Sequence, residues 1–171
     1  MEQRLSEHFT LTELTKVGPH AGVDNTPPEA FAGNAIRLAE MLERARAIWS
    51  AKLGRECLVR ISYGFRCQAL NDAVGGSPTS AHMLFLAADT IPDGFDIREA
   101  WDVLVADPAY CADVDQLIIE RGCIHIGLPV PTHANVPRHE LRLDAGPADH
   151  RSYPLYGWWT PQGVKRAGGE A

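Results

Sequence analysis

The feature that most constrains the fold is a pair of apolar segments on either side of the dipeptide Arg121-Gly122. Val114–Glu120 and Cys123–Leu128 have the composition of β-strands, and a two-residue connection that contains Gly is typical of a tight hairpin. In that register Glu120 pairs with Cys123 and Ile118 pairs with His125, which places these four side chains on one face of the sheet. A three-residue loop would shift the register and separate them.

A long helix is predicted in the first third of the chain. Apolar residues recur at helical spacing between Ala35 and Leu53, and Gly54 follows as a typical helix end. The residues that set this spacing are Ile36, Ala39, Leu42, Ala45, Ile48 and Trp49. We interpret the segment as an amphipathic helix that packs against the core.

Shorter elements complete the predicted fold. Thr10 to Leu14 fits a short helix that begins with a capping box, in which Thr10 is the N-cap and Glu13 its partner. Asp96 is predicted to cap a second helix that ends at Val105. A further short helix is predicted at Arg66–Val74, and strands are predicted at Cys57–Tyr63, Leu86–Ile91 and, as an edge strand, Arg138–Leu143. The fold class is therefore α+β, a small antiparallel sheet with flanking helices.

Length and composition favour one main domain. The 171 residues suffice for a real core, and we expect a domain over residues 1–143. Residues 144–171 are rich in Gly, Pro and charge, and we expect them to form an extension that packs on the domain and ends in a frayed tail.

Charge and hydropathy exclude several classes of partner. The net charge of −6 argues against binding to a nucleic-acid backbone. The sequence contains no apolar run long enough to span a bilayer, and its polar N-terminus does not resemble a signal peptide. We therefore expect a monomer that is synthesised in a cytoplasm, with neither a nucleic acid nor a membrane as its partner.

The cysteine pattern does not indicate a structural zinc site or a redox motif. Cys57, Cys67, Cys111 and Cys123 are scattered, without a Cys-x-x-Cys pair. The expected state is four free thiols.

Three residues instead predict a catalytic metal site. His82 and Asp89 lie seven positions apart, and His125 lies on the second strand of the hairpin. Two imidazoles and one carboxylate can hold zinc and leave a fourth position open for water, as catalytic sites do. A single buried His is more often a hydrogen-bonded core residue than a ligand, so the prediction rests on the three residues together.

These motifs resemble the M15 family of zinc D-Ala-D-Ala peptidases, especially its phage and prophage branch. The central motif is Ser80-x-His82-x(6)-Asp89 followed by the second-strand His125. The resemblance covers roughly Phe9 to Leu143, and five further segments contribute to it: Phe9–Leu14, Asp24–Pro28, Gly64-Phe65-Arg66, Leu70–Ser77 and Asp115–Gly127. The combination is much more specific than a lone His-x(6)-Asp.

The resemblance implies a small α+β fold shared with Hedgehog signalling domains, and zinc-dependent hydrolysis of peptidoglycan peptides. By match, the zinc ligands would be His82, Asp89 and His125. Arg66 matches the arginine that steadies a substrate carbonyl or carboxylate, and a guanidinium suits that role because it is planar and permanently charged. The enzyme would act at the cell wall as a phage or prophage product.

The general base is assigned from the hairpin. Many M15 enzymes place the base three residues before the last His, where this chain has Gly122. Glu120 is the available carboxylate, since the predicted register puts it on the face of His125. The other reading makes Glu120 a solvent-exposed residue at the end of the hairpin.

Two further positions are candidate substrate contacts. Ser80 either hydrogen-bonds the loop or substrate, or is a plain turn residue. Phe85 stands where the family usually has Gly, so it either narrows the cleft beside the metal or turns inward and fills the core. The family branch also tends to have Trp where this chain has Cys123, whose thiol is expected to face the metal.

Two classes of function follow from this reading. The first is a zinc peptidase that cuts peptidoglycan stem peptides next to D-amino acids, as a D-Ala-D-Ala carboxypeptidase or as an endolysin-type endopeptidase. The second is a non-catalytic module of the same fold that keeps the metal and serves in wall binding or in a virion; Phe85 is the feature that favours it.

Overall fold

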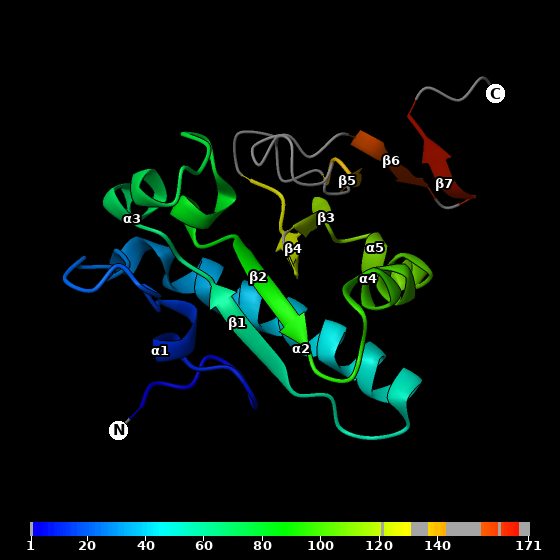
Figure 1. Ribbon diagram of the computed structural model, residues 1–171, viewed down its shortest axis with the longest axis horizontal. Helices are drawn as coiled ribbons and strands as arrows, with labels where there is room; N and C mark the ends of the chain where they lie inside the picture. The colour runs from blue at the N-terminus through cyan, green and yellow to red at the C-terminus, as the bar shows by residue number, and fades with distance from the viewer. Residues whose placement is uncertain (1, 121, 131–136, 143–154, 161, 168–171) are drawn as a thin grey trace.

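The structure is a computed structural model that describes residues 2–120, 122–130, 137–142, 155–160 and 162–167. These residues form an α+β fold around a seven-stranded sheet with the strand order β1-β2-β4-β3-β5-β6-β7 (Figure 1). The strands are β1 (Val59–Tyr63), β2 (Ala87–Pro92), β3 (Gln116–Glu120), β4 (Cys123–Gly127), β5 (Glu140–Arg142), β6 (Leu155–Thr160) and β7 (Gly163–Arg166). The helices are α1 (Leu11–Leu14), η1 (Glu29–Phe31), α2 (Ala32–Leu53), α3 (Gln68–Ala73), η2 (Ala81–Leu84), α4 (Ile97–Val105) and α5 (Pro108–Cys111).

The predicted hairpin is confirmed, including its register. β3 and β4 pair antiparallel, with Glu120 opposite Cys123 and Ile118 opposite His125. Gly122 has a φ of 80°, a left-handed conformation that glycine adopts at little cost. The two-residue loop is therefore the correct reading of this part of the sequence.

The helix caps also follow the sequence. Thr10 accepts a hydrogen bond from the backbone of Glu13 and completes the capping box of α1. Asp96 caps α4 through the backbone N–H of Arg98. Gly54 ends α2 in a left-handed conformation, but α2 begins three residues before the predicted start at Ala35. Ile36, predicted to face the core, is exposed.

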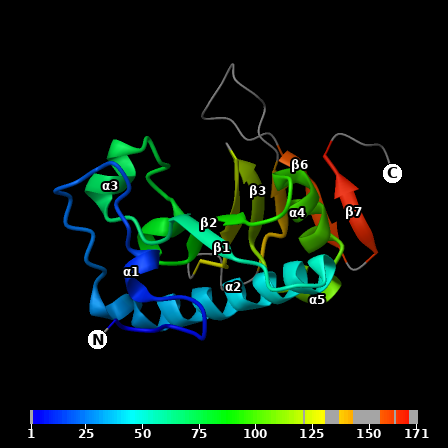
Figure 2. The ribbon, with the colours of Figure 1, turned by 60° about the horizontal axis from the view of Figure 1, so that its bottom comes forward.

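The sheet separates a core face from an open face. Figure 2 shows α2 running beneath the strands. Helix α4 packs on the same side of the sheet. The two helices are joined by a hydrogen bond that Trp49 of α2 donates to the carbonyl of Ala100 in α4. Alternate residues of the strands fill this core: Ala88, Ile124, Ile126, Leu117 and Leu141 are all buried in it. Since side chains alternate along a strand, their neighbours Asp89, His125, Ile118 and Arg142 project from the opposite face.

A strand is present within Arg138–Leu143, at Glu140–Arg142, but the predictions of an edge position for it and of an antiparallel sheet are wrong. β5 pairs in parallel with β3, so the sheet is mixed. β6 then pairs with the other side of β5, so β5 lies inside the sheet. Leu143 lies outside the described residues.

The C-terminal extension contributes strands to the same sheet. β6 and β7 form a hairpin in which Trp158 faces Lys165 and Trp159 faces Val164. Trp159 is buried, and its ring packs against His139. That residues 144–171 form an extension of a separate domain stays a prediction. The boundary at residue 143 stays a prediction, and the tail from residue 168 lies outside the described part.

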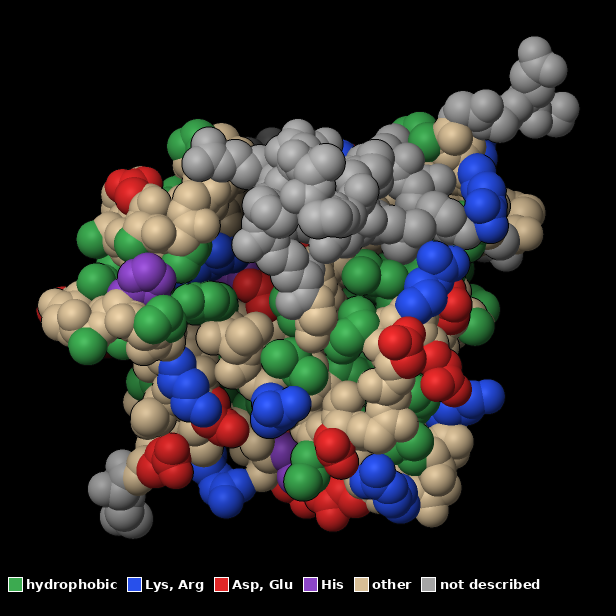
Figure 3. Space-filling model, in the orientation of Figure 1, with side chains coloured by type: hydrophobic (Ala, Val, Ile, Leu, Met, Phe, Trp, Pro, Cys, Tyr) green, Lys and Arg blue, Asp and Glu red, His purple; other side chains and the backbone are tan. Residues whose placement is uncertain are grey.

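Charges of both signs are interspersed on the surface. Figure 3 shows Lys and Arg beside Asp and Glu on the face that it draws. Ion pairs with exposed side chains include Arg44–Asp113 and Arg98–Asp102. Among the described residues, no helix is both long enough and apolar enough to cross a membrane.

Phe85 packs in the core, and its backbone is unusual. The side chain is fully buried, and its ring lies 5.4 Å from that of Phe65. Its φ of 58° and ψ of 36° place it in the left-handed region at the end of η2. This conformation explains why glycine suits the position, since a side chain there costs roughly 1–2 kcal/mol.

We predict that Phe85→Gly destabilises the protein less than Phe85→Ala, because both lose the buried ring but only glycine relieves the backbone. The loss should be about 3–5 kcal/mol for Ala and roughly 1 kcal/mol smaller for Gly. Chemical denaturation of both variants measures this difference. Leu38 lies in the middle of a helix and serves as the control: Leu38→Gly should lower the free energy of unfolding more than Leu38→Ala does. If Gly and Ala ranked in the same order at positions 38 and 85, backbone strain at Phe85 would not explain the difference.

Candidate metal site and cleft

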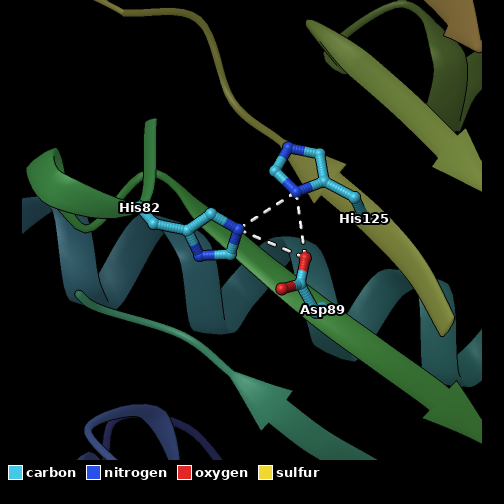
Figure 4. Close-up of side chains that lie close together, drawn as sticks. All are labelled: His82, Asp89 and His125. Atoms are coloured by element: carbon cyan, nitrogen blue, oxygen red, sulfur yellow. Dashed lines mark hydrogen bonds and ion pairs between the residues drawn. The ribbon is translucent and has the colours of Figure 1, made fainter. Parts of the chain in front are cut away.

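Three elements bring His82, Asp89 and His125 together. Asp89 on β2 lies directly opposite His125 on β4, so the sheet register alone makes these two side chains neighbours. His82 lies on η2, in the turn that leads into β2. Figure 4 shows the two imidazole rings and the carboxylate converging on one point.

The donor atoms of the three residues lie close together in a buried place. Asp89 Oδ1 is 3.2 Å from His82 Nε2 and 3.0 Å from His125 Nδ1, and the two nitrogens are 3.1 Å apart. Exposed fractions of 0% for His82, 4% for Asp89 and 6% for His125 show that water hardly reaches them. Ion pairs and hydrogen bonds in such a place are screened little by solvent.

The orientation of His82 is set by a backbone carbonyl. Its Nδ1–H donates a hydrogen bond of 2.6 Å to the carbonyl oxygen of Gly64, which leaves the lone pair of Nε2 facing Asp89 and His125. Gly64 itself packs against α1, where an added Cβ would collide with the carbonyl oxygen of Leu14. A histidine that donates its other ring N–H to a carbonyl in this way is typical of a metal ligand.

Burial and mutual contact shift the protonation of the group. Burial lowers the pKa of His82 to about 4, which keeps this imidazole neutral near pH 7. Burial also opposes ionisation of Asp89, but the adjacent imidazoles outweigh it and hold the pKa of Asp89 well below its usual range. Burial alone would lower the pKa of His125, but its hydrogen bond to Asp89 and the charges of Asp89 and Glu120 raise it.

The arrangement suits a metal ion. His82 Nε2, His125 Nδ1 and Asp89 Oδ1 are all potential electron-pair donors, and these atoms form a group that could hold a cation. In tetrahedral zinc coordination, bonds of ~2.0–2.1 Å place neighbouring donors roughly 3.3 Å apart. The observed separations of 3.0–3.2 Å need only a small outward movement to reach that value.

The group lies in a large cleft of about 1460 Å³. Glu120 and Cys123 from the hairpin line the same cleft, and a carboxylate oxygen of Glu120, the Cys123 sulfur and an oxygen of Asp89 lie within 4.8 Å of one another. Burial raises the pKa of the Cys123 thiol, with the carboxylates of Asp89 and Glu120 adding to the effect. The hairpin thus brings both side chains to the candidate metal site, as the predicted register requires.

Arg66 forms another part of the wall of the cleft. Its Nη2 is 3.8 Å from Asp89 Oδ2, and its guanidinium carbon lies 5.6 Å from the centre of the Tyr63 ring. The Arg66 side chain is 11% exposed, and its buried Nε has no hydrogen-bond partner among the described residues. A buried donor without a partner is costly, which makes a carboxylate or carbonyl from a bound molecule a favourable addition.

Two asparagines hold the loops that carry these residues. Asn25 donates to the carbonyls of Thr15 and Phe65 and accepts from the backbone N–H of Cys67, so it fixes the backbone on both sides of Arg66. Asn34 of α2 donates to the carbonyl of Leu84, the last residue of η2. These bonds satisfy backbone groups that would otherwise be left unpaired at a loop.

The remaining predicted site residues divide between the cleft and the core. Ser80 precedes η2 and lines the cleft, without a side-chain bond that caps the helix. Phe85 does not line the cleft: its side chain points into the core and is fully buried. The expectation that Phe85 narrows the cleft is therefore corrected, and the core-filling alternative is the one that its position supports.

Sequence reasoning assigned no role to Gly64 or Asn25, although both belong to recognised motif segments. Gly64 orients His82 through its backbone carbonyl, and Asn25 accepts a hydrogen bond from the distant backbone N–H of Cys67. Residue type and spacing in the sequence reveal neither contact. Their occurrence inside Gly64-Phe65-Arg66 and Asp24-Asn25-Thr26-Pro27-Pro28 was the available signal.

Comparison with known families agrees with this geometry. No curated protein matches the sequence. The family described as Peptidase M15 matches residues 7–126, a span that begins before α1 and contains His82, Asp89, Glu120 and His125. Because this match covers well over half of the chain, the protein belongs to the peptidase M15 family.

Proposed function

We propose that the protein is a zinc-dependent peptidase that hydrolyses peptide bonds next to D-amino acids in the stem peptides of peptidoglycan. The observation that carries the proposal is the convergence of His82 Nε2, His125 Nδ1 and Asp89 Oδ1 in a cleft. Two nitrogen donors with one carboxylate suit zinc better than calcium or magnesium, which prefer oxygen. Membership of the M15 family supports the reaction class, and the motif resemblance supports the substrate.

The chain's own residues have separable roles in this reaction. Zinc, when bound, polarises the scissile carbonyl and lowers the pKa of its bound water. Glu120 accepts a proton from the attacking water and passes it to the leaving amine. Arg66 binds a carboxylate or carbonyl of the substrate through its fork of N–H donors, and Tyr63 supports the guanidinium from one side. Ser80, which lines the same cleft, contacts the substrate.

The proposal includes where the enzyme acts. A D-Ala-D-Ala carboxypeptidase or an endolysin-type endopeptidase meets its substrate at the cell wall, and the resemblance to the phage and prophage branch favours a phage-encoded product. The same resemblance supports a fold shared with Hedgehog signalling domains. We expect a monomer whose partner is a peptidoglycan peptide rather than a nucleic acid or a membrane.

The non-catalytic alternative loses its main support. That reading rested on Phe85 as an obstruction in the cleft, but Phe85 is buried in the core. Arg66, Glu120 and the three candidate ligands all line the cleft instead.

We predict one zinc ion per chain, because three donors converge on one point. Elemental analysis of protein purified without added metal should give about one equivalent. His82→Ala should lose the metal and lower the melting temperature, since metal binding is coupled to folding. His20→Ala, which changes a histidine that does not line the cleft, should keep both. A zinc content well under half an equivalent per chain in the wild-type protein would exclude the metal site.

We predict that Gly64→Ala weakens zinc binding by roughly 10–100-fold, the usual effect of disturbing the partner of a ligand. The added Cβ would collide with the Leu14 carbonyl and displace the oxygen that orients His82. Competition with a fluorescent chelator measures the affinity. Gly33→Ala on α2 is the control, since its Cβ would meet nothing within 4 Å. Equal affinities in the two variants would show that the carbonyl does not position His82.

We predict that the metal-loaded protein releases fragments from purified peptidoglycan. Mass spectrometry of these fragments identifies the bond that is cut. Glu120→Gln should bind zinc and fold normally but lose roughly two to four orders of magnitude in rate, the usual contribution of a general base. Glu99→Gln on α4, an exposed position outside the cleft, should match the wild type. Near-normal turnover by Glu120→Gln would assign the base elsewhere, and the absence of any fragment would exclude hydrolysis of this substrate.

A further inference from the structure

One wall of the cleft is a loop, residues 74–80, which connects α3 to η2. All seven of its residues line the cleft. Arg66 lies shortly before α3, and His82 lies on η2, so the loop joins the segment of the proposed substrate contact to that of a candidate metal ligand. The loop contains neither helix nor strand. The shape of this wall therefore depends on side chains that hold the loop from behind.

Asn71 of α3 holds the loop through its side chain and its backbone. Its side chain is fully buried, and Nδ2 donates a hydrogen bond of 2.9 Å to the carbonyl of Ser77. Its own carbonyl accepts a bond of 2.8 Å from the N–H of Gly76. The N–H of Asn71 donates in turn to the carbonyl of Cys67, at the start of α3. Asn71 thus ties the middle of the loop to the helix that precedes it.

The other side-chain atom of Asn71 makes a contact of a different kind. Oδ1 is buried and has no hydrogen-bond partner among the described residues. The backbone of Gly76 packs against it so closely that an added Cβ would collide with Oδ1. A buried acceptor without a donor costs free energy, so the protein keeps this packing at the expense of stability. Such a cost is typical of a place where function requires a fixed geometry.

The two glycines of the loop are needed for separate reasons. Gly75 has a φ of 71°, in the left-handed region that glycine adopts at little cost. Gly76 is not among the described glycines with a positive φ, so its backbone would accept an ordinary residue. What excludes a side chain at Gly76 is the Asn71 carboxamide alone. Asn71 and Gly76 therefore act as a matched pair.

We propose that Asn71 is a positioning residue for substrate binding, which fixes the 74–80 loop as a wall of the cleft through its contact with Gly76. The inference rests on the proposed peptidase function. Asn71 does not itself line the cleft, so it acts on the substrate through the loop. A bound peptide meets this wall in the ground state and in the transition state alike, so a displaced loop weakens binding without slowing the bound complex. His82 has its own supports, Gly64 and Asn34, and zinc binding should persist.

The test is a double-mutant cycle of Asn71→Ala and Gly76→Ala. The probe is a peptide that ends in D-Ala-D-Ala with its last amide reduced, so calorimetry on zinc-loaded protein reports binding without cleavage. Each single substitution should weaken binding about 10-fold, the usual effect of a lost buried hydrogen bond or a displaced contact. The double variant should bind no more weakly than Asn71→Ala alone, because the shorter side chain leaves room for the new methyl group. Gly33→Ala, whose Cβ would meet nothing within 4 Å, is the control and should keep the wild-type affinity.

Kinetics on the same peptide with an ordinary amide separates positioning from general stability. Each single variant should raise KM about 10-fold and keep kcat within about twofold of the wild type, as expected for lost uniform binding. Zinc content should be unchanged in all variants. If Asn71→Ala does not fold, Asn71→Ser takes its place in the cycle, since it also removes the carboxamide that meets Gly76.

The outcomes distinguish the positioning role from the reaction. Wild-type affinity in the folded, zinc-loaded single variants, additive losses in the double variant, or a fall in kcat with KM unchanged would each overturn the role of Asn71. Cleavage by the wild type together with any of these results leaves the peptidase standing. Binding that follows the expected cycle without cleavage by the wild type keeps the positioning role and removes the proposed reaction. A wild type that does not bind the peptide would overturn both.

Discussion

The pairing of β2 with β4 is the constraint on which the site depends. It sets Asp89 opposite His125, and the alternation of each strand then sends Ala88, Ile124 and Ile126 to the other face, into the core. A slip of one residue would bury the charged pair among apolar side chains and expose the core residues. The hydrophobic core therefore specifies the register, and the register places two of the three candidate ligands without any local bond between them.

The third ligand depends on contacts of a different kind. His82 lies on a short helical turn, and its orientation depends on the carbonyl of Gly64, while Asn34 holds the end of that turn. Gly64 in turn packs against the backbone of Leu14 in α1. The three donor atoms therefore meet for two reasons. The sheet fixes Asp89 and His125, and contacts with Gly64, Asn34 and, through Gly64, α1 fix the turn that carries His82. Removing any one support would let His82 move while Asp89 and His125 stay in place.

The sequence predicted the parts of this structure that local patterns encode. The hairpin register followed from a two-residue loop, the caps from Thr10 and Asp96, and the grouping of His82, Asp89 and His125 from residue types and family motifs. The parallel pairing of β5 with β3 was not predictable in this way, because it joins segments across a long connection and leaves no periodic signal. For Phe85 the sequence left two positions open, the cleft and the core, and its positive φ was not predictable because residue type alone disfavours it.

Asn25 connects the N-terminal part of the chain to the loop that carries Arg66, the proposed substrate contact. Its side chain joins the end of α1 to the backbone on both sides of Arg66, although it lies more than 40 positions before that arginine's loop ends at Cys67. The described residues before Asn25, from position 2 onward, contribute none of the side chains that line the cleft. They nevertheless support Arg66 through the bond between Asn25 and Thr15, and they support His82 through the contact between Leu14 and Gly64. Shortening the chain from this end would therefore loosen both the Arg66 guanidinium and one candidate metal ligand.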